Sequence, residues 1–541
     1  MDTKEYVLML GAGLMQRPAI DAIRALGYSS VVIDANPDAP CARLGDDFRA
    51  IDLKDTDAIV ALASELNAEG RLRGVFTAGT DFSANVAAAA ASQNLPGHSV
   101  QACRNASNKV AMRRCFAEAG VPSPEFSEIT DENFDLFAAK SASLAYPLVV
   151  KPVDNMGARG CRMVRSANEF ASAVQDAVRY SRSGTAILEA YMDGAEFSID
   201  SVVYDGTLTI TGFADRHIFY PPYFIETGHT MSTCISEEER LALIRCFAAG
   251  VRALGLTCGA AKADIKLTSD GPMIGEIAAR LSGGYMSGWT FPYSSGCNLT
   301  LELLKIATGK EPDIILKNRV PVAGGNGAAF ALYEYPCAAT SAERAWLSVP
   351  GVAAHISGLD KASRIPCIKD VFPCRKEGDA LVFPHNNVEK CGNVISQSAD
   401  YAEAVAAAEE AVAAITVRLE PNNARTDEFL SHLAHELPEQ FPPDAYSFTP
   451  RQFAKLMDLC GDTIVPADKS PRECFDERLT RALFAEDRRD WNHISIDCAV
   501  ERFDELCHEH PAFALSDFVR CLVRGGLQGI LYLADSAVCS K

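Results

Sequence analysis

Strand and helix patterns alternate through the first 105 residues of this 541-residue chain. The apolar run YVLMLG meets a glycine turn, and a helical pattern then continues to Leu26. The runs SSVVIDA and GVFTAG are each followed by a further helical pattern. Parallel strands need crossover connections of this kind, so the pattern predicts a parallel sheet with helices between its strands. We therefore expect an α/β fold that begins with one such domain over residues 1–107.

The glycine turn offers two interpretations. Gly11 and Gly13 match the first two glycines of the dinucleotide-binding fingerprint, but the third position is Gln16. Asp34 ends the second predicted strand, close to where a ribose-binding acid would lie. The same residues also fit a tight turn that lets a helix pack closely on a strand. NAD binding and a purely structural turn both remain open at this point.

The pattern changes after residue 107. Strands with hairpin turns such as YDGTL and TSDGP are predicted as far as residue 320. Residues 321–420 hold strands broken by Gly and Pro, followed by the helical pattern YAEAVAAAEEAVAAI. Beyond Pro421 the chain becomes helical and more acidic. We predict four parts, which are residues 1–107, 108–320, 321–420 and a helical extension over 421–541 that matches no function.

Composition excludes several classes of protein. The net charge of −20 repels phosphate backbones, which argues against nucleic acid as a partner. No apolar run approaches the ~20 residues of a membrane helix, and the N-terminus lacks the features of a signal peptide. Eighteen cysteines are scattered without any C-x-x-C pair, which is typical of reduced thiols. We expect a cytoplasmic protein with small-molecule partners and no membrane contact.

The stretch KADIKLTSDGPMIGEIAARLSGG predicts a hairpin that carries two acids. Asp264 and Glu276 are twelve residues apart, so a hairpin centred on Asp270 places them opposite each other. Like charges that face each other across strands are destabilising unless positive charge lies between them. A divalent cation supplies that charge, and carboxylate oxygens suit Mg²⁺ or Mn²⁺.

Other residues of the hairpin bear on this interpretation. Arg280 falls on the same face as the two acids and would point towards the same site. Alternatively, the hairpin is exposed and Lys262 and Lys266 neutralise the acids. From this segment alone, both interpretations stand.

Segments upstream of the hairpin have features typical of a site that binds a nucleotide together with a metal ion. Lys151 ends the apolar run YPLVVKP, and the glycine loop DNMGARG that follows could wrap phosphates with its backbone N–H groups. Glu189 and Glu196 lie on either side of a short linker that contains Tyr191 and Met192. No Walker A motif is present, so the chain is not a P-loop protein.

In this order, the segments resemble the ATP-grasp superfamily of carboxylate ligases over roughly residues 1–420. The resemblance implies a two-lobe nucleotide-binding core preceded by a Rossmann-like domain that forms one wall of the cleft and binds no dinucleotide. It implies ATP and Mg²⁺ or Mn²⁺ as cofactors, with Asp264 and Glu276 as metal ligands and Arg280 as the arginine that stabilises the phosphoryl intermediate. The residues that match its nucleotide contacts are Lys109, Lys151, Gly157, Arg159, Gly160, Glu189, Tyr191, Met192 and Glu196.

Within this superfamily the sequence is most similar to the L-amino-acid ligases. The stretch YPPYFIETGHTMS resembles their substrate loop, in which Glu226 and His229 would meet the first amino acid. The resemblance implies a carboxylate–amine ligase that forms an acyl phosphate, releases ADP and pairs as a homodimer. The identities of the carboxylate and the amine do not follow from it.

Three positions depart from the pattern of the superfamily. Ala278 stands where an Asn metal ligand is usual, Ala158 replaces a frequent Ser of the glycine loop, and Asp264 replaces a more common Glu. These departures leave two alternatives open. One is an ATP-binding protein without catalysis, and the other is a bicarbonate-using enzyme of the carboxylase or carbamoyl-phosphate-synthetase type.

Overall fold

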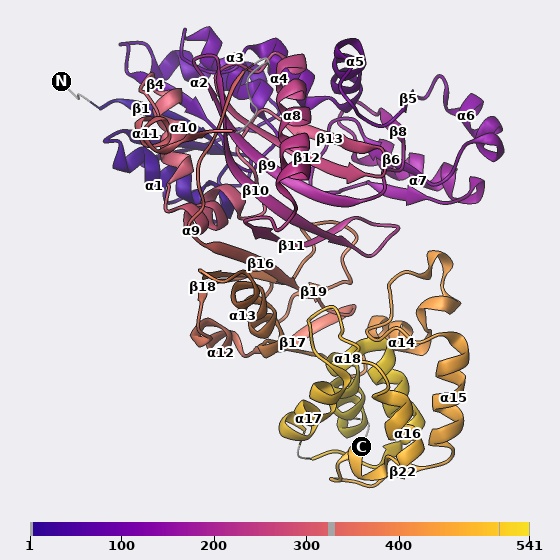
Figure 1. Ribbon diagram of the computed structural model, residues 1–541. Helices are drawn as coiled ribbons and strands as arrows, with labels where there is room; N and C mark the ends of the chain where they lie inside the picture. Colours follow the sequence, from indigo (N-terminus) through magenta and orange to yellow (C-terminus); the bar gives the residue numbers. More distant parts are fainter. Residues whose placement is uncertain (1–3, 323–329, 508, 540–541) are drawn as a thin grey trace. The chain divides into compact units, whose positions relative to one another are not determined.

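The computed structural model describes residues 4–322, 330–507 and 509–539 (Figure 1). It divides into two compact units. The first comprises Met1–His217, Gly228–Ala342 and Gln397–Tyr401, and the second comprises Ile218–Thr227, Glu343–Ser396 and Ala402–Lys541. The four-part division expected above stays a prediction. In the described ranges, no helix is both long enough and apolar enough to cross a bilayer.

The first unit begins with the predicted parallel sheet, which is confirmed. Its strand order is β3-β2-β1-β4, and all three neighbouring pairs are parallel. The short strand β3 was not predicted, because its sequence DFRA has no apolar alternation and is half exposed. The strands are β1 (Tyr6–Leu10), β2 (Ser29–Asp34), β3 (Asp47–Ala50) and β4 (Leu72–Phe76), and the helices are α1 (Arg17–Ala25), α2 (Thr56–Leu66), α3 (Ser83–Ser92) and α4 (Val100–Ser107).

A small antiparallel sheet follows and carries Lys151. Helix α5 (Lys109–Ala119) leads into it and ends at Gly120, whose φ of 67° closes the helix in the left-handed conformation. The sheet has the order β5-β8-β6-β7, and α7 packs on it through an apolar core that includes Phe170. Its elements are β5 (Phe126–Ile129), α6 (Phe134–Lys140), β6 (Leu148–Pro152), β7 (Arg162–Val164), α7 (Ala167–Tyr180) and β8 (Ala186–Ala190).

A larger sheet forms the rest of the first unit and holds the predicted hairpin. Within this unit its strands run in the order β13-β12-β9-β10-β11. Helix α8 covers one face and buries Phe247 there, so charged residues on the opposite face can form a site (Figure 1). The strands are β9 (Ala195–Tyr204), β10 (Thr207–Phe219), β11 (Ile225–Met231), β12 (Gly259–Thr268), β13 (Gly271–Ala278), β14 (Val320–Pro321) and β15 (Ala331–Glu334). The helices are α8 (Glu237–Leu254), α9 (Phe291–Ser295), α10 (Leu299–Ala307) and α11 (Asp313–Asn318).

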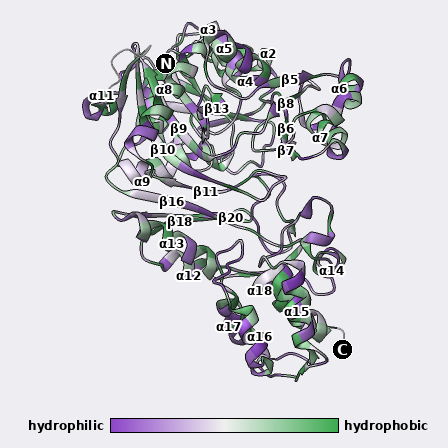
Figure 2. Cartoon of the chain, turned by 45° about the vertical axis from the view of Figure 1, so that its right-hand side comes forward, coloured by the Kyte–Doolittle hydropathy of each residue, from purple (hydrophilic) through white to green (hydrophobic). Residues whose placement is uncertain are grey.

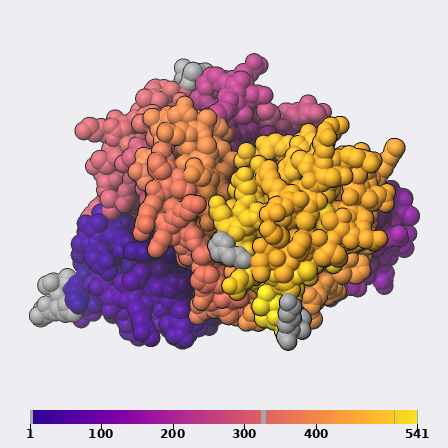
Figure 3. All heavy atoms as spheres, turned by 90° about the horizontal axis from the view of Figure 1, so that it is seen from below, coloured from indigo at the N-terminus to yellow at the C-terminus, as the bar shows by residue number. Residues whose placement is uncertain are grey.

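The second unit combines short strands with the predicted C-terminal helices. Figure 2 shows hydrophilic and hydrophobic residues on different sides of α15, α16 and α17, as expected for helices that cover a core. In Figure 3, residues after about 420 form one continuous area of orange to yellow spheres. The strands are β16 (Thr340–Trp346), β17 (Gly351–Ser357), β18 (Ile368–Pro373), β19 (Ala380–Leu381), β20 (Gly392–Ser398), β21 (Thr416–Leu419), β22 (Ile464–Val465) and β23 (Phe513–Ala514). The helices are α12 (Leu359–Arg364), α13 (Tyr401–Ala414), α14 (Ala424–Ser431), α15 (Pro450–Cys460), α16 (Glu477–Leu483), α17 (Ile496–Leu506) and α18 (Leu515–Cys539).

Candidate active site

The residues of the N-terminal glycine turn bond to one another and to the domain around them. The Asp34 carboxylate, expected near a ribose, accepts a hydrogen bond from the Ala12 N–H at 3.0 Å. Gln16, at the third fingerprint position, accepts from the Gly13 N–H at 2.8 Å and donates to the Ala78 carbonyl. The Asp34 and Gln16 side chains thus form hydrogen bonds within the turn and its own domain. These bonds favour the structural interpretation of the turn over NAD binding.

The hairpin of β12 and β13 pairs its two acids as predicted. Asp264 lies directly opposite Glu276. Next to the turn, however, Thr268 lies opposite Gly271. If that register continued along the strands, Asp264 would lie opposite Gly275 and not Glu276. A bulge at Gly275 absorbs the difference and brings Glu276 back opposite Asp264.

Cations surround the two carboxylates. Lys262 Nζ lies 2.5 Å from one oxygen of Asp264, and Arg216 Nη1 lies 3.1 Å from the other. Lys109 Nζ lies 3.4 Å from Glu276 Oε1. Burial by itself would raise the pKa of Glu276, but Lys109 and the other cations outweigh burial and lower it. Glu276 is therefore ionised at neutral pH.

This environment bears on both interpretations of the hairpin. The Asp264 and Glu276 side chains are only 16% and 26% exposed, so the hairpin does not lie open to solvent. Lys262 does neutralise Asp264, as the alternative expected, whereas Lys266 pairs with Glu196.

The donor set around the hairpin fits Mg²⁺ with an incomplete protein shell. Asp264 and Glu276 provide hard oxygen ligands, and Ala278, opposite Lys262, provides none. Across the ranges that the structure covers, no group of three or more His, Cys, Asp and Glu side chains is placed to hold a metal. Mg²⁺ is commonly bound by one or two carboxylates together with water and substrate phosphates, and two carboxylates satisfy that requirement.

Lys151 is held in place by a buried acid. Its Nζ lies 2.7 Å from Glu189 Oε2 on the neighbouring strand β8, and Arg113 Nη2 lies 2.7 Å from the other oxygen. Burial opposes both charges, but the ion pairs outweigh it, so the pKa of Lys151 is raised and that of Glu189 is lowered. The Glu189 carboxylate thus holds the lysine, and a nucleotide contact of Glu189 stays a prediction.

The glycine loop connects β6 to β7. Gly157, Ala158 and Gly160 have φ values of 70°, 60° and 68°, and successive residues of this kind turn backbone N–H groups towards one side of a loop. Arg159 Nε donates to the Met156 carbonyl at 3.1 Å, and burial together with Arg182 lowers the pKa of Arg159. The loop therefore has the geometry and the cation expected of an anion cradle.

The linker after β8 is tied to the hairpin by Lys266. Its Nζ lies 5.2 Å from the centre of the Tyr191 ring, donates to the Met192 carbonyl at 3.2 Å and lies 3.5 Å from Glu196 Oε2. Arg216 Nη1 lies 2.5 Å from Glu196 Oε1. The structure thus brings the predicted linker residues next to the predicted metal ligands.

Arg216 and Arg113 are site cations that the sequence reasoning missed. Arg216 is on β10, and its only local signal is a charge within the strand-like run FADRHIF. Arg113 is one turn after Lys109 on α5, where a second cation near the first was the available signal. Neither signal identifies the acidic partner, because Glu196 and Glu189 lie on other elements.

The predicted substrate residues are on β11, and both are buried. His229 lies on the sheet face of Asp264. Met231, two residues further on, approaches within 3.0 Å of the position that a Cβ would take at Gly212. Gly212 is opposite Asp200 in the sheet, and Asp200 is opposite Lys262 in β12. Lys262 is two residues before Asp264, so all these residues share one sheet face.

Glu226 belongs to the second unit. Its N–H donates to Asn387 Oδ1, and its carbonyl accepts from Lys390 Nζ, each at 2.9 Å. The structure therefore groups His229, but not Glu226, with the residues of the first unit.

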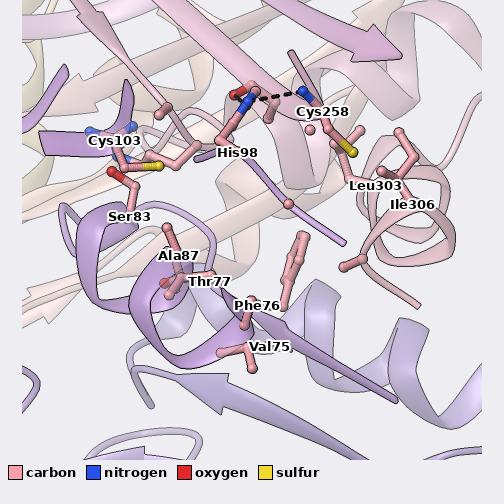
Figure 4. A pocket seen from close by; sticks show the side chains of 18 of the residues that line it. Val75, Phe76, Thr77, Ser83, Ala87, His98, Cys103, Cys258, Leu303 and Ile306 are labelled. Carbon is pink, nitrogen blue, oxygen red and sulfur yellow. Dashed lines mark hydrogen bonds between the residues drawn. The ribbon is translucent and has the colours of Figure 1, made fainter. Parts of the chain in front are cut away.

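Arg280 is among the residues that line a cavity of ≈ 70 Å³. Figure 4 shows this cavity. Its walls are mostly apolar and come from β4, α3 and α10, with Phe76 and Leu303 among them. His98 is fully bonded at its edge. Nδ1 accepts from the N–H groups of Thr257 and Cys258 at 3.1 Å, and Nε2 donates to the Ala260 carbonyl at 2.9 Å. The histidine therefore ties the first domain to the start of β12.

Two family models match the chain. The ATP-grasp domain matches residues 144–288, which include the glycine loop, the linker and the hairpin. The L-amino acid ligase C-terminal domain 2 matches residues 345–420.

Two curated relatives differ in how much of their length is shared. An uncharacterized protein of Sinorhizobium fredii is 25% identical over 427 residues, which are 77% of this chain and 84% of the relative. The formate-dependent phosphoribosylglycinamide formyltransferase of Burkholderia thailandensis is 30% identical over 189 residues, which are 34% of this chain and 46% of the relative. The match thus spans less than half of the formyltransferase.

Solved structures show the same fold. The L-amino acid ligase from Bacillus licheniformis is 21% identical with a TM-score of 0.65, and the match covers 78% of this chain and all of that one. The biotin carboxylase domain of 2-oxoglutarate carboxylase from Hydrogenobacter thermophilus, solved with MgADP, ADP and bicarbonate, is 16% identical with a TM-score of 0.56. That match covers 76% of this chain and 90% of the domain.

Proposed function

We propose that this chain is an ATP-grasp ligase that activates the carboxylate of an amino acid as an acyl phosphate and joins it to the amine of a second small molecule. The observation that carries the proposal is the carboxylate pair Asp264 and Glu276, set among Lys109, Lys262 and Arg216 on one sheet face. A face that combines two acids with several cations suits a metal-bound polyphosphate.

In the first step, a carboxylate oxygen of the substrate attacks the γ-phosphorus of ATP. The bond from that phosphorus to the β–γ bridging oxygen breaks, and ADP leaves. Lys109 and Lys151 hold the phosphates, and Arg280 binds oxygens of the transferring group with its planar guanidinium. Mg²⁺, held by Asp264 and Glu276, would neutralise phosphate charge when bound.

In the second step, the amine nitrogen attacks the acyl carbon, the carbon–oxygen bond to phosphate breaks, and an amide forms. The amine enters as an ammonium group. It loses one proton to a base, for which His229 is our candidate, before it attacks, and a second proton to the departing phosphate as the amide forms. Glu226 would orient the first amino acid. The glycine loop over residues 156–160 would cover the reacting groups and exclude water.

ADP release and hydroxylamine trapping test the proposal. Full-length protein is incubated with Mg-ATP, hydroxylamine and pools of amino acids. We expect ADP and a hydroxamate with at least one pool, because hydroxylamine intercepts an acyl phosphate. Bicarbonate-dependent turnover without a hydroxamate would instead favour a carboxylase-type enzyme. ATP binding without turnover on any pool would favour a non-catalytic protein, the candidate that Ala278 supports.

Replacing Glu276 with Gln should lower the rate of ADP release by about 100-fold or more, since one of two metal carboxylates is lost. The thermal unfolding temperature should fall moderately, because the amide keeps the shape of the side chain but leaves buried Lys109 without the charge of its acid. Glu118→Gln, on the exposed face of α5, is the matched control and should keep full activity. Full turnover by Glu276→Gln would refute the metal assignment.

Three finer points are part of the proposal. Mn²⁺ should replace Mg²⁺ after removal of metal with EDTA, because both take hard oxygen ligands. All eighteen cysteines lie at described positions and are free thiols, which suits a reducing cytoplasm. A homodimer rests on the resemblance to L-amino-acid ligases alone, and a measurement of mass in solution tests it.

A further inference from the structure

The loop between β4 and α3 is docked on the chain segment that carries Arg280. Ala78 forms an isolated β-bridge with Leu281, and the Gly79 N–H donates to the Leu281 carbonyl at 3.3 Å. A Cβ added at Gly79 would lie 3.4 Å from the Gly283 Cα, so the two backbones pass close to each other. The first domain is thereby joined to the end of the hairpin at several points.

The N-terminal glycine turn supports the same loop from the other side. Gln16, buried in that turn, donates through its Nε2 to the Ala78 carbonyl. Thr77 Oγ1 donates to the Leu10 carbonyl at 2.8 Å, which holds the start of the loop to β1. The loop is thus fixed before it reaches Asp81, three residues after Ala78.

Asp81 is buried beside Arg280. Its residue is only 5% exposed, and its Oδ1 lies 3.8 Å from Arg280 Nε. Arg280 donates through Nη1 to the Leu281 carbonyl at 3.1 Å, and its buried Nε has no hydrogen-bond partner among the described residues. Burial raises the pKa of Asp81, Arg280 opposes that rise, and Glu276 adds to it.

The geometry points to Asp81 as a positioning residue that holds the Arg280 guanidinium against the reacting phosphoryl group. This inference rests on the proposed function, in which Arg280 binds the transferring oxygens. Arg280 follows the end of β13 and has one carbonyl partner, so the strand alone does not fix the guanidinium. A buried carboxylate beside Nε restrains the rotation of the guanidinium and leaves Nη2 to face the substrate.

Asp81 acts through its negative charge, and its effect on the reaction passes through Arg280. In a buried ion pair, removal of one charge leaves the other uncompensated. Loss of the Asp81 charge should therefore misplace Arg280 while leaving the nucleotide contacts of Lys109 and Lys151 intact. The expected signature is a fall in kcat with little change in KM for ATP.

A double-mutant cycle on Asp81→Asn and Arg280→Lys tests this. ADP release and hydroxamate formation are measured in the wild type, both single variants and the double variant. We expect Asp81→Asn to lower kcat about tenfold with KM for ATP within twofold, and to cause no further loss in the Arg280→Lys background. Multiplicative losses in the double variant, or an unchanged kcat in Asp81→Asn, would overturn the inference.

Two further variants separate positioning from folding. Asp81→Glu keeps the charge and should recover most of the lost kcat, even if Asp81→Asn is unstable. Asp46→Asn is the matched control, since Asp46 is an acid of the same domain whose Oδ2 accepts from the Ser30 N–H at 2.8 Å and Ser30 Oγ at 3.0 Å. It should change thermal stability but not kcat. A kcat in Asp81→Glu as low as in Asp81→Asn would contradict a role of the charge.

The same assay distinguishes failure of the inference from failure of the proposed function. If the wild type forms no hydroxamate with any acid, the proposed function falls and takes the role of Asp81 with it. If the wild type forms hydroxamate and the cycle is multiplicative, only the role of Asp81 falls.

Discussion

Three pairs of buried charges in the first unit join elements that are far apart in the sequence. Lys151 of β6 pairs with Glu189 of β8, and Lys109 of α5 pairs with Glu276 of β13. Asp81, in the loop after β4, pairs with Arg280. Because an isolated buried charge is costly, each cation is restrained by an acid nearby. The site is thus preorganised for anions before a nucleotide binds.

His98 shows how a single buried side chain makes a contact between distant segments of the chain sensitive to pH. Burial lowers its pKa from 6.5 to about 4, so it is neutral in the folded protein at pH 5 and protonated in the unfolded chain. The unfolded state then binds more protons, and stability falls as the pH drops from 6.5 towards 4. We expect a loss of about 2 kcal/mol between pH 7.5 and 5.

Hydrogen exchange can measure the effect of His98 protonation at the residues that bond to it. The N–H groups of Thr257 and Cys258 donate to His98 Nδ1, which cannot accept once it is protonated. Their protection, corrected for intrinsic exchange rates, should fall between pH 7.5 and 5 in the wild type. In His98→Gln the protection should be lower at both pH values and independent of pH. Equal protection of the wild type at both pH values would contradict a neutral buried His98.

At the scale of elements, local sequence patterns predicted the strands and the hairpin but not the contacts between them. Alternating apolar residues and the Ser-Asp-Gly turn are local signals, and they predicted both the parallel sheet and the pairing of Asp264 with Glu276. The bulge at Gly275 has no such signal, because a single glycine in a strand also fits several other local structures. The contact of Asp81 with Arg280 depends on how the loop after β4 packs on the end of β13, which strand periodicity does not encode.

The connection from β8 to β9 gives a test at this scale. Gly194 lies between Met192 and Glu196 with φ +83°, and an added Cβ would be 1.9 Å from the Leu267 carbonyl oxygen. Gly194→Ala must therefore displace the linker from the hairpin, and we expect KM for ATP to rise about tenfold, by analogy with the loss of one good binding contact.

Gly206→Ala provides the comparison for that variant. Gly206 has φ +67° in the turn between β9 and β10, but an added Cβ would meet nothing within 4 Å. The substitution should cost about 1 kcal/mol of backbone strain and leave KM for ATP unchanged. If both variants raise KM alike, strain rather than the clash with Leu267 explains the effect.

At the scale of the whole molecule, the C-terminal helices share a core with the strands that precede them. Gln528 of α18 donates to the Val417 carbonyl at 3.1 Å and to Ser348 Oγ at 3.0 Å, and accepts from the Val349 N–H at 3.2 Å. Asn492 exchanges two hydrogen bonds with the Leu347 backbone at 2.8 and 2.9 Å. Hydrogen bonds therefore cross the border predicted at residue 420, which composition alone suggested.

A chain that ends at residue 420 should not form the second unit, because the strands would lose both these hydrogen bonds and the apolar cover of α18. We expect it to aggregate, whereas Gln528→Ala in the full chain should fold with a loss of about 1–3 kcal/mol from unpaired backbone groups. Gln175→Ala, on the exposed face of α7, is the control and should unfold like the wild type. Thermal unfolding and solution mass measure both effects. A monodisperse 1–420 chain with the unfolding temperature of the full protein would show instead that the helical extension is a separate addition.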